Sequence, residues 1–215
     1  MMNNKILLST AYLPPIQYVT KFLQYEEIWI EKHESFIKQS YRNRTVILTA
    51  NGSESLVVPI AKSDSRSIKD IRISYDTNWQ HIHWNAIVSA YSSSPFFEIL
   101  EDDFKRFFHE KTKYLIDFNN SLLQVVFDIL EIVPNLHYTE QFENVSGNYS
   151  NFREIIHPKP QKSLTDESFV PCPYTQVFEE RFGFVPNLSI LDLLFSCGSE
   201  SYEILLKGNV GRLEC

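Results

Sequence analysis

The chain has 215 residues, a length that a single hydrophobic core can serve, and its 27 acidic and 20 basic side chains give a formal charge of −7. With 43% hydrophobic and 14% aromatic residues, the composition excludes disorder of the whole chain. An acidic surface repels phosphate backbones, so we expect no nucleic-acid partner. No apolar run reaches the roughly 20 residues of a transmembrane helix, and we therefore expect no membrane span.

Cysteine usage and the first residues indicate the compartment. The three cysteines, Cys172, Cys197 and Cys215, are an odd number and contain no Cys-x-x-Cys pair. The opening apolar run is too short for a signal peptide. We therefore predict a cytoplasmic protein without structural disulfides.

The first thirty residues predict a β-α-β unit. Residues 5–10 are the apolar run of a buried strand, and Pro14-Pro15 suit a helix start, where a missing N–H costs nothing. Apolar residues then recur at helical spacing up to Gln24, and residues 27–30 form a second strand. Such a unit normally makes a parallel pair with a right-handed crossover.

A hairpin is expected next, because residues 44–49 and 55–60 are β-rich and flank Asn51-Gly52. Ile71 and Ile73 alternate with polar residues and suggest a further strand. The predicted fold is mixed α/β, with a central mixed sheet of about five strands and several helices packed on it.

Helices are predicted over most of the remaining chain. Thr77 to Gln80 has capping-box spacing, and Ser94-Pro95 resembles a second helix start. The expected helices are 77–90, 95–110, 114–132, 176–182 and 189–197. We expect a main α/β domain over 1–138, a polar, Pro-containing loop or tether over 139–173, and a helical segment over 174–215 packed on the same domain.

Motifs for nucleotide cofactors and metals are absent. The chain has six glycines and no Gly-x-Gly-x-x-Gly, phosphate loop, Gly-x-Ser-x-Gly or His-Glu-x-x-His. His81 and His83 lie two apart on a predicted helix, where side chains point about 200° apart and cannot share an ion. We predict neither a cofactor nor a metal site.

Two segments could bind an anion. On a strand, Arg42 and Arg44 would point to one side around Asn43 and could clamp a phosphate or carboxylate; the alternative is a solvated strand end with salt bridges. Gln17, in the first turn of the first helix, lies beside amide dipoles that favour anions, or is simply a surface glutamine.

Acid–base candidates come from two further segments. Trp79 and His83 share one helix face, so His83 could act as a general base in an aromatic pocket, or could be a core histidine bonded to a carbonyl. Glu31, His33 and Glu34 follow a strand and could supply an acid or base, or could be solvated.

Taken in order, three segments resemble the WbqC-like family. They are Tyr12-Leu13-Pro14-Pro15-Ile16-Gln17-Tyr18, Tyr41-Arg42-Asn43-Arg44, and Trp79-x-x-x-His83 followed by Tyr91 and Ser94-Pro95-Phe96-Phe97. The ending from Phe182 to Phe195 resembles a shorter branch associated with Bacteroides-type bacteria. Many relatives carry two adjacent acidic residues before the Arg-Asn-Arg equivalent, whereas this chain has Glu31-Lys32-His33-Glu34.

The resemblance implies a role in the assembly of surface polysaccharide or O-antigen. It suggests a transferase that acts on a sugar or sugar nucleotide and attaches an amino acid such as glycine; the alternative is a non-catalytic protein that binds or scaffolds a glycan intermediate. The residues it implies for the substrate site are Tyr12, Gln17, Arg42, Asn43, Arg44, Trp79 and Tyr91, with His83 as the catalytic base. We expect their polar ends to converge around one cavity.

Overall fold

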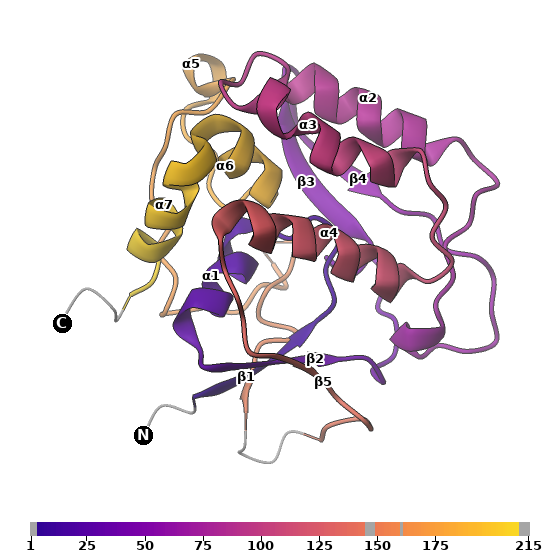
Figure 1. The fold of residues 1–215 in the computed structure, drawn as a ribbon. Coiled ribbons are helices and arrows are strands. Elements are labelled where there is room, and N and C mark those ends of the chain that lie inside the picture. The colour runs from indigo at the N-terminus through magenta and orange to yellow at the C-terminus, as the bar shows by residue number, and fades with distance from the viewer. Residues whose placement is uncertain (1–3, 145–148, 160, 211–215) are drawn as a thin grey trace.

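A four-stranded parallel sheet forms one layer of the computed structural model, which describes residues 4–144, 149–159 and 161–210 (Figure 1). Its strands are β1 (Lys5–Ser9), β2 (Glu27–Glu31), β5 (Leu136–Tyr138) and β6 (Ser150–Asn151). The order is β5-β2-β1-β6 and each neighbouring pair is parallel. The carboxyl ends of all four strands therefore meet at one edge.

The predicted β-α-β opening is confirmed. Helix α1 (Ile16–Gln24) connects β1 to β2, which pair from Lys5↔Glu27 to Ser9↔Glu31. Pro15 is the helix N-cap and has an extended backbone. Proline has no N–H, and this costs nothing here because the N–H groups at a helix start have no partner within the helix.

The mixed α/β class is confirmed, and the predicted hairpin forms a sheet of its own. Strands β3 (Arg44–Thr49) and β4 (Gly52–Val57) pair in antiparallel fashion around a tight turn. The strand predicted at Ile71 and Ile73 was wrong: both side chains are buried, but Ile73 makes only an isolated bridge to Ile60. The alternation there reflects an extended segment packed on the core without a strand alongside it.

Helices cover the sheet and the hairpin. They are α2 (Trp79–Tyr91), α3 (Phe97–Lys105), α4 (Leu115–Leu130), α5 (Glu179–Phe182), α6 (Ile190–Cys197) and α7 (Ser201–Lys207). Three-residue 3-10 turns lie at Ile68–Asp70, Arg106–Phe108 and Gly198–Glu200. The predicted capping box at Thr77 was wrong. Asn78 is the N-cap of α2, and its side chain accepts no hydrogen bond from the first turn of the helix.

Helix α4 lies between α3 and the parallel sheet (Figure 1), and its buried side chains belong to two apolar clusters. Leu123 and Phe127 pack with the parallel sheet and α1. Phe118 and Leu122, from another face of the helix, pack with the hairpin and with α2, α3 and α6. One amphipathic helix with apolar residues on more than one face thus joins both halves of the core.

The segment 139–173 is largely irregular, as expected, but it also contributes β6 to the sheet. Ile6 pairs with Ser150 and Leu7 with Asn151. A polar dipeptide shows no apolar alternation, so the pattern used to predict strands could not find it.

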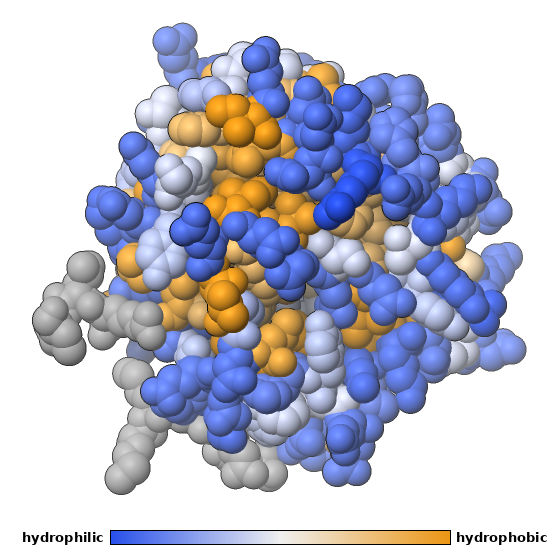
Figure 2. Space-filling view, in the orientation of Figure 1, coloured by the Kyte–Doolittle hydropathy of each residue, from blue (hydrophilic) through white to orange (hydrophobic). Residues whose placement is uncertain are grey.

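On the face shown in Figure 2, hydrophobic residues gather over the region of α6, α4 and α1, and polar residues surround them. Within the ranges that the structure describes, no helix combines the length and apolar character needed to cross a membrane.

Two glycines with positive φ give a matched test of packing. A Cβ on Gly198 (φ 52°) would lie 2.4 Å from the Phe96 ring, whereas a Cβ on Gly183 (φ 67°) would meet nothing within 4 Å. We expect Gly183→Ala to cost about 1 kcal/mol from backbone strain and Gly198→Ala about 2–4 kcal/mol because Phe96 must also move. Urea unfolding measures both. Equal losses would contradict the contact with Phe96.

Candidate functional site

The carboxyl edge of the parallel sheet carries a buried group of ionic and polar side chains. Ser9 ends β1, Glu31 ends β2 and Thr139 follows β5. Arg153 follows β6. Hydrogen bonds and ion pairs to the carboxylates of Glu31 and Glu34 join these residues into one group. Open α/β sheets usually bind ligands at this edge.

Glu31 is fully buried and anchored from three segments of the chain. The Thr139 hydroxyl donates to it at 2.7 Å, and the backbone N–H groups of His33 and Glu143 donate at 2.8 Å each. Arg153 lies 3.6 Å from the same carboxylate. Glu31 therefore fastens the loops that follow β2, β5 and β6, and its oxygens are already occupied.

Glu34 forms a two-pronged ion pair with Arg42. The Arg42 Nε and Nη2 atoms donate to the two carboxylate oxygens at 2.8 and 2.6 Å, and the Ser9 hydroxyl adds a bond of 3.2 Å. Nη2 also reaches Glu154 at 3.2 Å. Burial raises the pKa of Glu34, and the bonds from Arg42 oppose that shift. The guanidinium of Arg42 is thus neutralised within the protein.

Two cavities share Tyr41, which precedes Arg42 in the chain. The inner one, next to Tyr18, Arg42 and Arg153, has a volume of about 20 Å³, enough for one water molecule. The outer one has about 510 Å³ and is lined by His157, Ser163 and Asn187 among others. Its volume lies in the range of small-ligand sites.

His157 and Tyr41 give the outer cavity its polar character. The backbone N–H of Lys159 donates to His157 Nδ1 at 3.0 Å, which leaves Nε2–H of the neutral ring as a donor. Burial lowers the pKa of His157, so the neutral ring is favoured. Burial also raises the pKa of Tyr41 to about 12, so its phenol stays protonated. The sequence analysis missed His157 because no acidic, basic or nucleophilic residue lies near it in the chain at a spacing typical of a catalytic or metal-binding motif.

Gln17 lies against this cavity rather than on the open surface. It receives a hydrogen bond of 3.1 Å from Asn187 Nδ2, and its own backbone N–H donates to Asn187 Oδ1 at 2.9 Å. Its amide donates to Asp166 at 2.8 Å, and Asp166 pairs at 2.6 Å with the buried Lys21. Gln17 therefore holds Asn187, a cavity residue, to the start of α1.

Tyr12, Trp79 and His83 form a separate aromatic group in the core. The Tyr12 hydroxyl lies 2.9 Å from His83 Nδ1. Trp79 meets His83 edge-on, with ring centroids 5.0 Å apart. Burial lowers the pKa of His83 to about 4. The shared helix face of Trp79 and His83 is confirmed, and the contacts of His83 match those of a core histidine.

The remaining predicted residues do not join one anion clamp. Arg42 precedes β3 and turns inward, while Arg44 begins the strand, so their side chains do not share its face. Asn43 donates to the Val58 carbonyl at 2.8 Å. Tyr91 is fully buried and packs on Phe195 at a centroid distance of 5.5 Å.

His33 is half-buried beside Glu31 and uses its backbone N–H there. The predicted residues thus divide into the ionic edge, the Gln17 network and the aromatic core. Groups of three or more possible metal ligands are absent from the described part of the chain. Burial raises the pKa of the Cys197 thiol to about 11, which disfavours a thiolate, and Cys215 lies outside the described residues.

The fold and this edge define an α/β protein whose candidate site lies at the carboxyl end of a parallel sheet. The chain belongs to the WbqC-like protein family, whose model matches residues 10–159. It is 24% identical over 221 residues to the uncharacterized protein Rv1507c of Mycobacterium tuberculosis, an alignment that covers 91% of each chain. No solved structure matches this chain.

Proposed function

We propose that this chain is a transferase that acts on a sugar or sugar nucleotide in the synthesis of bacterial surface polysaccharide, with an amino acid such as glycine as a candidate for the transferred group. The observation that carries the proposal is the cavity of about 510 Å³ that Tyr41, His157 and Asn187 line. Its volume and its hydrogen-bonding walls suit a polar, sugar-sized ligand.

Each wall of the cavity has a distinct role in this proposal. The Tyr41 ring packs against a sugar face and its hydroxyl donates a hydrogen bond. Nε2–H of His157 donates to a ligand oxygen, and Asn187, held by Gln17, orients polar groups. The ion pairs and hydrogen bonds of Glu31 and Glu34 fix the loops that carry Tyr41 and His157. A rigid cavity would hold the sugar and the group to be transferred close together and correctly oriented, and this positioning lowers the barrier to reaction.

Replacing His157 by glutamine tests the cavity. We expect binding of the preferred sugar nucleotide to weaken about tenfold, the loss of one hydrogen bond to a polar ligand. Calorimetric titration of a panel of sugar nucleotides, with and without glycine, measures the change. The exposed His109, replaced in the same way, serves as control because it lies at the end of a 3-10 turn and does not line this cavity. Equal affinity in both variants would contradict this site.

A non-catalytic glycan-binding protein is the second candidate. One observation favours it: the carboxylates of Glu31 and Glu34 and the Nδ1 atom of His83 are already bonded within the protein. Mass spectrometry of products after incubation with a sugar nucleotide and an activated glycine, such as a glycyl thioester, separates the two. A transferase forms the glycyl-sugar bond and releases the carrier thiol, whereas a binding protein retains the ligand unchanged.

A further inference from the structure

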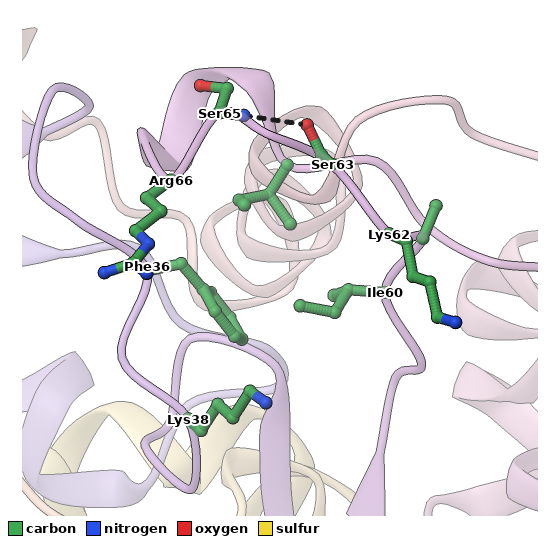
Figure 3. Close-up of a pocket in the computed structure, with 9 residues that line it drawn as sticks. Phe36, Lys38, Ile60, Lys62, Ser63, Ser65 and Arg66 are labelled. Carbon is green, nitrogen blue, oxygen red and sulfur yellow. Dashed lines mark hydrogen bonds between the residues drawn. The ribbon is translucent and has the colours of Figure 1, made fainter.

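A second cavity, of about 520 Å³, lies on another part of the molecule and has a basic lining (Figure 3). Phe36 and Ile60 extend toward one another from opposite walls, and Lys38, Lys62 and Arg66 lie around them. No carboxylate side chain lines this cavity. In a chain where acidic residues outnumber basic ones, a purely cationic lining marks a local reversal of the overall charge.

The three cations are available to a ligand. Lys38, Lys62 and Arg66 are exposed, and none of them forms an ion pair with a carboxylate among residues 4–144, 149–159 and 161–210. By contrast, Arg42 and Lys21 are buried and paired. Unlike Arg42, these three side chains therefore keep their charge free of an internal partner among the described residues.

The walls are held by backbone pairing and are not loose surface. The Phe36 N–H donates to the Arg66 carbonyl at 2.7 Å, and Ser35 and Ser67 form a β-bridge. The Ile68 N–H donates to the Glu34 carbonyl at 2.9 Å. The segment after β2 thus has two sides, with the Glu34 side chain at the ionic edge and Phe36 in the basic cavity.

We propose that this cavity binds a nucleoside phosphate. The flat base would lie against Phe36 and Ile60, and the phosphates would be held by Lys38, Lys62 and Arg66. An aromatic side chain offers a stacking face to any base, and exposed Lys and Arg side chains bind phosphate oxygens with charge-assisted bonds. The lining combines these two features, and the volume suits a ligand of that size. This site stands apart from the proposed function, because different residues form it.

The test uses uridine diphosphate as the probe, with uridine and inorganic pyrophosphate for its two halves. We expect the Lys62→Gln/Arg66→Gln double variant to bind the diphosphate at least about tenfold more weakly, and raised salt to weaken the wild type in the same direction. Phe36→Leu should weaken the diphosphate and leave pyrophosphate unchanged. Both substituted cations are exposed, so far-ultraviolet circular dichroism should confirm an intact fold.

The matched control is Lys105→Gln/Lys111→Gln, which removes the same charge from side chains that do not line the cavity. A loss of affinity equal to that of the cavity variant would reduce the effect to net charge and overturn the proposal. Pyrophosphate binding as tight as that of the diphosphate would overturn the role of Phe36, and so the nucleoside class. His157→Gln should leave this affinity unchanged, which separates failure here from failure of the proposed transferase site.

Discussion

Replacing Arg42 by methionine should lower the free energy of unfolding by about 3–5 kcal/mol, the usual cost of leaving one partner of a buried ion pair alone. Arg42 is 2% exposed and supplies two of the hydrogen bonds on Glu34. Without Arg42, the Glu34 carboxylate remains buried, and the Ser9 hydroxyl is the one side chain among the described residues that still donates a hydrogen bond to it. Urea unfolding at neutral pH measures the loss.

The double variant Arg42→Met/Glu34→Leu is the control for that result. We expect it to recover most of the lost stability, because replacing both partners removes the unpaired charge. The difference in stability between the single variant and the wild type should also narrow near pH 4. Burial raises the pKa of the Glu34 carboxyl, so the folded state holds the proton more tightly than the unfolded chain. This contribution is fully present below the unfolded pKa and is lost as pH rises through the folded pKa. A pH-independent loss in the single variant would contradict an unpaired charge as the cause.

Acid should destabilise the protein through His83. Burial lowers its pKa to about 4 from the ordinary 6.5. Between these values the unfolded chain binds a proton that the folded chain does not, so this contribution is present above pH 6.5 and is lost as pH falls toward 4. The full window is worth roughly 3 kcal/mol. Unfolding free energies measured across this range should show the slope.

His83→Gln should flatten that slope, while His81→Gln should keep it. His81 lies on the same helix, is exposed and bonds Asn85. Activity gives a second readout. If His83 is the general base predicted from the family pattern, His83→Gln abolishes turnover without weakening substrate affinity; if it is a core residue, the effect follows stability alone. An unchanged slope in His83→Gln would refute the buried, uncharged histidine.

Local patterns predicted the elements whose signals are strong and continuous. The β-α-β opening follows from one apolar run, a proline pair and helical spacing, and α4 follows from a repeating apolar face. The Asn51-Gly52 turn likewise predicted the hairpin. Weak local signals failed: Ser150-Asn151 joins the sheet only because β1 offers it an edge, and Ile71 alternates without a strand alongside it.

The site depended on contacts between distant segments. The order of motifs was enough to predict the family, and spacing placed Trp79 and His83 on one helix face. Whether Arg42 binds a ligand or a carboxylate was decided by Glu34, because burial makes an internal partner far more favourable than an unpaired charge.

By itself, then, the sequence determined the α/β class, the parallel opening and the family, since those rest on short-range periodicity and on ordered motifs. Only the tertiary structure decided which charges are used internally. It buried Arg42 and Lys21 in ion pairs and left Lys38, Lys62 and Arg66 exposed around a cavity. It also brought His157 of the 139–173 segment beside Tyr41. The physical reason is that hydration and pairing depend on neighbours in space, and the spacing along one chain does not encode them.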